Sequence, residues 1–253
     1  MKAVLRVLLL VGLSVFSLQL YFVGRIALMA VVDPESTAFE RSAVYSVAST
    51  TGSLKWRQQW TAYGDMSDNL KRAVIASEDA TFTEHEGVDM EALEKAWDKN
   101  VKAEQKALQS SKALNANPAK PAKPAKPTKP PKVIGGSTIT QQLAKNLFLS
   151  GERTLLRKGQ ELVLTLLLEK LLAKERILEI YLNSVEWGEG VFGAEAASQY
   201  YYRKSAANLS AYEAARLAVM LPRPKYFETR PNSGYLSSRA NTIVARMGSV
   251  ELP

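Results

Sequence analysis

The chain has 253 residues, a formal net charge of +8, 46% hydrophobic residues and no cysteine. A chain of this length can hold one domain of roughly 170 to 200 residues plus attachments, and the lack of cysteine excludes disulfides and thiolate metal sites. Seven lysines and no acid lie between residues 105 and 135, which leaves only +1 of the +8 for the rest of the chain. The body therefore lacks the broad basic face that nucleic acid binding needs.

The amino terminus has the composition of a membrane segment. Residues 7–24 form an uncharged run of 18 residues that Lys2 and Arg6 precede. The positive-inside rule then predicts a cytoplasmic amino end. A cleaved signal peptide is the alternative, but its apolar run usually has only ~7 to 15 residues. We expect residues 1–32 to form a cytoplasmic tip and a transmembrane anchor in the inner membrane, with residues 33–253 in the periplasm.

A candidate catalytic acid lies in the segment AVIASEDATFTEHEGVD, residues 73–89. Leu70, Ala73 and Val74 recur at helical spacing, and Glu78 follows Val74 by four residues on the same face. Burial raises the pKa of a carboxylate, which suits a group that accepts a proton near neutral pH. An ordinary ion-paired helix residue is the alternative interpretation of Glu78.

A second segment, GGSTITQQLAKN at residues 135–146, predicts the start of an amphipathic helix. Ser137 and Thr138 are candidate caps, and Gln141 follows Thr138 at capping-box spacing. Free backbone N–H groups at such a start form an anion site, and Lys145 lies about one turn further along.

A third segment, RKGQE, places Arg157, Lys158 and Glu161 within one helical turn of one another. A solvated salt-bridge cluster is the common interpretation of such a triplet. The following residues, LVLTLLLEKLL from Leu162, are apolar almost all round, so we expect a buried central helix here.

Together these segments resemble the peptidoglycan glycosyltransferases of glycosyltransferase family 51, which polymerise lipid II. A fourth matching segment, KERILEIYLNSVEWGEGVFGAEAASQYY, begins at Lys174, and the resemblance runs from about residue 56 to about residue 230. The single anchor and the early end of the chain resemble the monofunctional members. The sequence contains no Ser-x-x-Lys motif followed by Lys-Thr-Gly, so nothing in it indicates a transpeptidase.

The resemblance implies a mainly α, lysozyme-like glycosyltransferase domain of two lobes behind one transmembrane helix, with the substrate in the cleft between the lobes. Its partners would be lipid II, the growing glycan strand, membrane lipids and other cell-wall synthesis or division proteins. Two further functions fit parts of the pattern: a membrane-anchored glycan hydrolase that uses Glu78, and a non-catalytic wall-binding scaffold. A hydrolase has no use for a cation cluster sized for pyrophosphate, so that cluster discriminates between them.

The resemblance also assigns roles to residues. Glu78 is the general base, and Lys145, Arg157 and Lys158 stabilise the pyrophosphate leaving group together with the helix start at Ser137 and Thr138. Glu161 either orients Arg157 and Lys158 or holds a divalent cation, Mg²⁺ or Mn²⁺, against the pyrophosphate. Four residues are expected in or beside the cleft: Asp79, Phe82, Gln142 and Asn183. The only histidine, His85, has no cysteine partner or serine elbow, so we expect it to position the Glu78 loop by hydrogen bonding.

The chain departs from the family pattern in a Pro/Lys/Ala-rich insertion at about residues 113–133. A helix is expected to end before it, near Leu108. In NPAKPAKPAKPTKPPK, proline at every third position favours polyproline II, which would align five lysines along one edge. We call residues 117–132 the lysine arm. A neutral spacer is one interpretation of the arm, and contact with anionic lipid headgroups or wall polymer is the other.

The glycines of GEGVFG match a dinucleotide-binding fingerprint, G-x-G-x-x-G, at residues 188–193. The preceding residues have a helical pattern, whereas that fingerprint must follow a strand, so we expect a turn between helices instead. Ser210 and Glu213 predict another capping box, and further helices are expected at residues 194–202 and 237–247.

Overall fold

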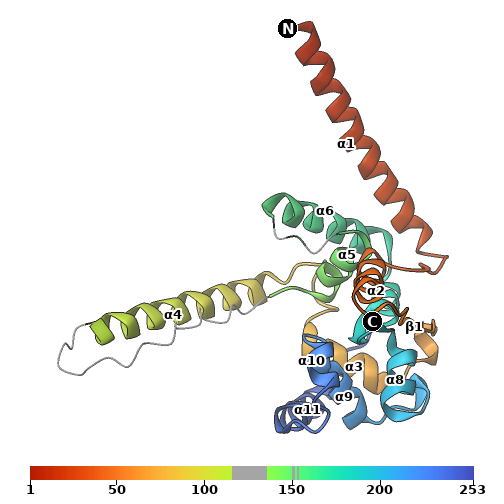
Figure 1. Ribbon diagram of the computed structural model, residues 1–253, viewed down its shortest axis with the longest axis vertical. Helices are drawn as coiled ribbons and strands as arrows, with labels where there is room; N and C mark the ends of the chain where they lie inside the picture. The colour runs from red at the N-terminus through yellow and green to blue at the C-terminus, as the bar shows by residue number, and fades with distance from the viewer. Residues whose placement is uncertain (116–135, 150–151, 153) are drawn as a thin grey trace. The chain divides into compact units, whose positions relative to one another are not determined.

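The computed structural model describes residues 1–115, 136–149, 152 and 154–253, and this part of the chain is mainly helical, as predicted (Figure 1). Its elements in chain order are α1 (Lys2–Leu28), α2 (Ala38–Thr51), β1 (Arg57–Gln58), the 3-10 helix η1 (Tyr63–Asp65), α3 (Asp68–Glu78), α4 (Met90–Asn115), α5 (Ile139–Phe148), α6 (Leu155–Leu171), α7 (Lys174–Ser184), β2 (Glu186–Gly188), β3 (Val191–Phe192), α8 (Ala194–Tyr202), the 3-10 helix η2 (Ala206–Asn208), α9 (Ala211–Met220), α10 (Pro224–Glu228) and α11 (Gly234–Met247).

The contacts divide the chain into two compact units, residues 88–137 and the remainder. The smaller unit contains α4, which ends at Asn115 and not near Leu108 as predicted. No glycine or proline occurs between Leu108 and Pro118, so nothing in the sequence stops the helix earlier. The lysine arm lies outside the described residues.

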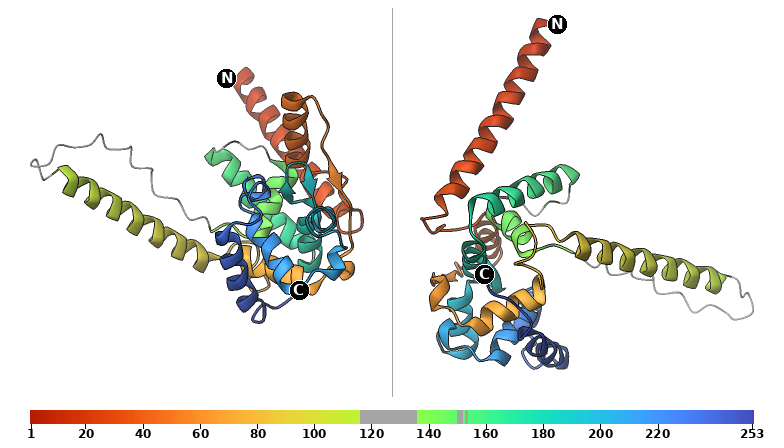
Figure 2. Two further views of the ribbon diagram at one scale, coloured as in Figure 1. Left: turned by 60° about the horizontal axis from the view of Figure 1, so that its bottom comes forward. Right: turned by 180° about the vertical axis from the view of Figure 1, so that it is seen from behind.

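The larger unit contains two groups of helices. In one group α3, α9 and α11 pack on one another, and in the other α5 contacts α2, α6 and α7, with α5 and α6 side by side in Figures 1 and 2. Helix α7 also contacts α8 and η1. Its apolar residues are almost completely buried, so α7 is the central helix of this unit.

Helix α6 is not the buried central helix that its composition predicts. Leu164 and Leu168 are fully buried, but Leu155 is 93% exposed and Leu166 is 50% exposed. A helix that is apolar all round needs an apolar environment on every side, and that environment is a protein core or a membrane. The composition alone does not distinguish the two.

The glycine-rich segment predicted as a turn lies between α7 and α8 and forms a small hairpin. Strand β3 pairs with β2 in antiparallel fashion and with β1 in parallel fashion. Gly190 at the turn has φ of 72°, and a Cβ atom there would lie 2.3 Å from the carbonyl oxygen of Lys55. The glycines belong to this antiparallel hairpin of β2 and β3 and not to the loop of a parallel βαβ unit, so the dinucleotide-binding interpretation is excluded.

Capping boxes begin three of the helices in the described part of the chain. The predicted boxes of Thr138 with Gln141 and of Ser210 with Glu213 are both confirmed. A third box, of Thr37 with Glu40, begins α2. The predicted helices at residues 194–202 and 237–247 are present as α8 and α11.

Candidate active site

Glu78 is the last residue of α3, and its side chain is half-buried. Its Oε2 accepts a hydrogen bond from Gln142 Nε2 on α5 at 3.1 Å. Gln142 Oε1 in turn accepts from the buried hydroxyl of Tyr181 on α7, also at 3.1 Å. Ser77 donates to Oε1 of Glu78 at 3.3 Å. Tyr181 thus orients Gln142, and Gln142 fixes one oxygen of the carboxylate.

The surroundings of Glu78 change its pKa in the direction that a general base requires. Desolvation raises the pKa of this carboxyl above its ordinary value, and the negative charge of Asp79 acts in the same direction. The hydrogen bonds from Gln142 and Ser77 and the positive charge of Arg239 on α11 lower it, but the net shift is upward. Sequence analysis did not identify Arg239, because it is far from every matching motif.

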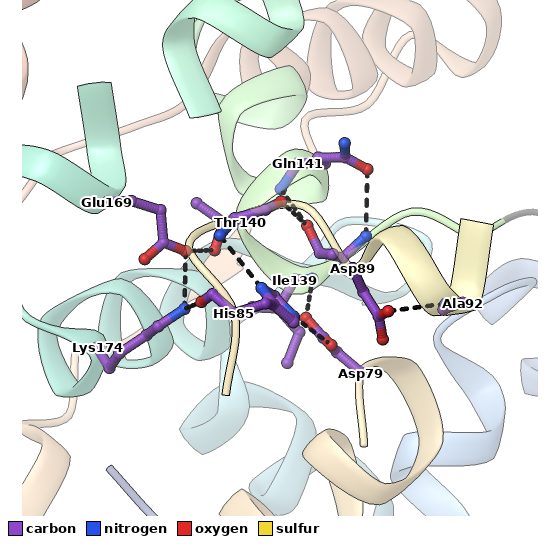
Figure 3. A network of polar contacts seen from close by, with 11 residues as sticks. Asp79, His85, Asp89, Ala92, Ile139, Thr140, Gln141, Glu169 and Lys174 are labelled. Atoms are coloured by element: carbon purple, nitrogen blue, oxygen red, sulfur yellow. Dashed lines mark hydrogen bonds and ion pairs between the residues drawn. The ribbon is translucent and has the colours of Figure 1, made fainter. Parts of the chain in front are cut away.

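Asp79 and His85 form a fixed network at the start of α5 (Figure 3). Asp79 Oδ2 accepts from the backbone N–H of Ile139 at 2.9 Å, and its Oδ1 lies 2.8 Å from His85 Nε2. The N–H of Gly87 donates to His85 Nδ1 at 3.1 Å, so Nε2 carries the proton that His85 donates to Asp79. His85 therefore holds Asp79, the residue next to Glu78, by a hydrogen bond.

Because of this network, the start of α5 is not the free anion site that its sequence predicts. The carboxylate of Asp79 already occupies the first N–H group of α5. The hydroxyl of Thr138 donates its one proton to Gly87 O at 2.7 Å and accepts from Gln141 N, so it has no proton left to donate to a ligand. Ser137 is exposed. The start of α5 binds an anion, as its chemistry predicts, but the anion belongs to the protein.

Lys174, the first residue of α7, is a contributor that sequence analysis missed. Its ammonium group donates to His85 O at 2.6 Å and to Glu169 of α6 at 2.9 Å. It also lies 4.5 Å from the ring centroid of Phe82. Phe82 is fully buried, so it packs the loop after α3 and does not face a substrate. Figure 3 shows Lys174 and Glu169 beside the Asp79 network.

The predicted cation cluster is present on the first turns of α6. Glu161 is only 4% exposed, its Oε2 accepts from Arg157 Nη1 at 2.8 Å, and its Oε1 pairs with Lys158. The side chain of Arg157 is largely buried, whereas that of Lys158 is half exposed. Glu161 therefore orients both cations, which is one of its two predicted roles.

Glu161 does not fit its other predicted role as a ligand of Mg²⁺ or Mn²⁺. Both of its oxygens are already engaged by cations. Among residues 1–115, 136–149, 152 and 154–253, no group of three or more acids or histidines has the arrangement of a metal site.

Lys145 on α5 interacts electrostatically with Glu78 and with the cation cluster. Its side chain reaches solvent, yet desolvation of its ammonium group lowers its pKa. The charge of Glu161 opposes this change, those of Arg157 and Lys158 add to it, and Glu78 acts as a further opposing charge. Lys145 is therefore within electrostatic range of both Glu78 and Glu161.

Asn183 lies in the interior and not in the cleft. Its Oδ1 accepts from Thr61 N, and its Nδ2 donates to Thr61 O and Glu179 O, each at 2.9 Å. The side chain is fully buried and its amide is satisfied, so Asn183 attaches the segment before η1 to α7.

Comparisons with known proteins identify the family of the chain. The transglycosylase family model matches residues 46–114 and 119–248. The chain is 51% identical over 235 residues to a biosynthetic peptidoglycan transglycosylase of Burkholderia thailandensis, covering 93% of this chain and 82% of that protein. It is 49% identical over 241 residues to the protein of the same name from Herminiimonas arsenicoxydans, covering 95% and 93% of the two chains. The chain therefore belongs to the transglycosylase family.

Proposed function

We propose that the protein is a membrane-anchored peptidoglycan glycosyltransferase that polymerises lipid II into glycan strands. The observation that carries this proposal is the pair of groups that the fold holds in place: a half-buried acid, Glu78, bonded to Gln142, and the cluster of Arg157, Lys158 and Glu161 on α6. Transfer from a polyprenyl pyrophosphate needs a proton acceptor for the incoming hydroxyl and positive charge for the departing pyrophosphate.

The reaction follows from these two requirements. The 4-hydroxyl oxygen of the acceptor lipid II forms a bond to the anomeric carbon of the donor strand, while the bond from that carbon to undecaprenyl pyrophosphate breaks. The hydroxyl proton passes to Glu78. Attack from the face opposite the leaving group inverts the anomeric carbon, so an α linkage becomes a β linkage.

The groups around Glu78 support its role as the base. Desolvation makes the carboxylate a better proton acceptor, and the hydrogen bond from Gln142 fixes Oε2. Tyr181 donates to Gln142 Oε1, which directs the amide nitrogen of Gln142, and not its oxygen, toward Glu78.

The cation cluster would stabilise the charge that develops on the leaving pyrophosphate. Glu161 holds Arg157 and Lys158 before substrate binds, so little reorganisation is needed during the transfer. Lys145 would contact the pyrophosphate from the side of Glu78.

Incubation of the purified full-length protein with lipid II tests the proposal directly. We expect glycan polymer with β linkages and released undecaprenyl pyrophosphate. A glycan hydrolase would instead shorten preformed glycan strands, and a scaffold would bind wall material without changing lipid II.

The anchor gives the protein access to a lipid-borne substrate. Within the described residues, α1 alone is long and apolar enough to cross a membrane. We propose that it crosses the inner membrane once, with Lys2 and Arg6 on the cytoplasmic side and residues 33–253 as the periplasmic glycosyltransferase domain. The exposed leucines of α6, which contacts α1, would meet the outer leaflet.

The pH dependence of polymerisation should report the raised pKa of Glu78. The base acts only when deprotonated, so the rate should fall with decreasing pH at a higher pH than an ordinary glutamate would give. Gln142→Leu removes a hydrogen bond that favours the charged form, which raises the pKa further and should move this fall to higher pH. The measurement is the rate from pH 4 to 9, with Gln199→Leu as the control. Identical profiles for wild type and Gln142→Leu would contradict the assignment.

The lysine arm is proposed to contact anionic lipid headgroups. Replacing Lys120, Lys123, Lys126, Lys129 and Lys132 by glutamine should weaken binding of a version without residues 1–32 to anionic vesicles. We expect a loss of up to ~1 kcal/mol for each lysine that reaches the surface, decreasing as salt rises. Vesicle co-sedimentation measures the effect, with neutral vesicles as the control. Equal binding of both versions at low salt would favour the neutral spacer.

A further inference from the structure

The anchor helix α1 packs on the catalytic body through one stripe of its surface. Phe22 and Ile26 are buried, and Gln19 and Val23 are partly buried, whereas the residues before Gln19 are exposed. These positions follow helical spacing, so one face of the last third of α1 is covered. Phe22 meets Phe148 of α5 edge to face, with ring centroids 5.3 Å apart.

Gln19, the first residue of this stripe, is polar and exchanges two hydrogen bonds with one side chain of α6. Gln19 Nε2 donates to Gln160 Oε1 of α6 at 3.1 Å, and Gln160 Nε2 donates to Gln19 Oε1 at 3.3 Å. Gln19 is the only strongly polar side chain in the apolar run of residues 7–24. An amide without a hydrogen-bond partner in hydrocarbon has an unfavourable free energy, and each of these two side chains supplies the other with a partner.

The position of Gln160 in α6 gives the contact its significance. It directly precedes Glu161 and follows Arg157 by three residues. The contact therefore attaches the helical turn that carries the cation cluster to the anchor.

A second contact holds the other end of the anchor. Arg176 of α7 donates to the carbonyl oxygen of Met29 at 2.7 Å, and its guanidinium pairs with Asp33 at 2.7 Å. The anchor is thus attached to the body through Gln19, Phe22 and the segment around Met29, and of these Gln19 contacts a neighbour of the cluster, Gln160.

We propose that the Gln19–Gln160 pair is a positioning element for the transfer reaction. It holds the first turns of α6, and with them Arg157, Lys158 and Glu161, at a fixed place against the anchor. Because the donor's pyrophosphate is attached to a lipid in the same membrane, the pair sets the cluster at the place where that pyrophosphate is presented. This inference rests on the proposed function.

The test compares full-length Gln19→Leu, Gln160→Leu and the double variant with wild type in vesicles. Leucine favours membrane insertion, so the anchor is retained. With natural lipid II we expect KM to rise about 3- to 20-fold, the range for loss of a hydrogen-bonded pair between membrane helices, with kcat within about twofold. The double variant should lose no more than either single variant, because loss of one partner already breaks both bonds and the double variant leaves no amide unpaired. Ser14→Leu, which removes an exposed polar group of the anchor, is the matched control.

A second substrate separates positioning from a general loss of structure. With a water-soluble lipid II analogue that has a short prenyl chain, the glutamine variants should match wild type, because this substrate does not depend on the membrane for its position. An equal loss on both substrates, or an unchanged KM for natural lipid II, would overturn the inference. If wild type polymerises neither substrate, the proposed function itself is wrong, and this inference is overturned with it.

Discussion

Glu78→Gln is expected to lower the rate of lipid II polymerisation by at least ~100-fold while the fold stays intact. Glutamine keeps the volume of the side chain and can still bond to Gln142, but it cannot accept the acceptor's proton at neutral pH. The measurement is the initial rate of polymer formation, with circular dichroism to check the helical content.

The matched control for this variant is Glu84→Gln. Glu84 is exposed in the loop that follows α3, so the substitution removes an equal charge near the site without removing the base. It should keep most of the wild-type rate. If Glu78→Gln keeps more than about a tenth of that rate, Glu78 is not the base.

Loss of the cluster cations should also impair turnover strongly. Removal of one preorganised donor to a developing charge typically lowers kcat by ~10² to 10³-fold, and we expect this range for Lys158→Ala and for Arg157→Ala. Lys158→Ala is the cleaner variant, because Lys158 is half exposed, whereas loss of the largely buried Arg157 also weakens the pairing of the buried Glu161 carboxylate. Single-turnover rates with lipid II measure the effect on the chemical step.

The control for the cluster is Lys170→Ala, on an exposed position of the same helix. It removes the same charge and should leave the rate nearly unchanged. Normal polymerisation by both Lys158→Ala and Arg157→Ala would show that the pyrophosphate is stabilised elsewhere. Lys145→Ala should also lower the rate, and the loss should be smaller than in the cluster variants if Lys145 contacts the pyrophosphate only from the edge of the site.

The local motifs were predictable because their chemistry is local. Capping boxes depend on residues three positions apart, and Arg157, Lys158 and Glu161 meet within one turn of a single helix. The contacts of Asn183 and Phe82 were not predictable in the same way. Both residues belong to matching motifs, but whether a motif side chain faces the substrate or the interior depends on helices that are distant in sequence.

The helix start at Thr138 shows the same limit. Its sequence predicts free N–H groups, and the structure fills the first of them with Asp79, a residue about 60 positions earlier. The sequence shows that an anion is favoured there, but the tertiary structure, which brings the residue after α3 to the start of α5, decides which anion is bound.

By itself the sequence determined an amino-terminal helix long and apolar enough to cross a membrane, the helical class, the family and the residue types of the candidate site. Each of these depends on composition or on spacing within one segment. The tertiary structure alone decided which face of α6 is exposed, that Lys174 holds the loop after α3, and that Gln19 pairs with Gln160. These features depend on where separate helices meet, and helical periodicity defines an apolar face without identifying what packs against it.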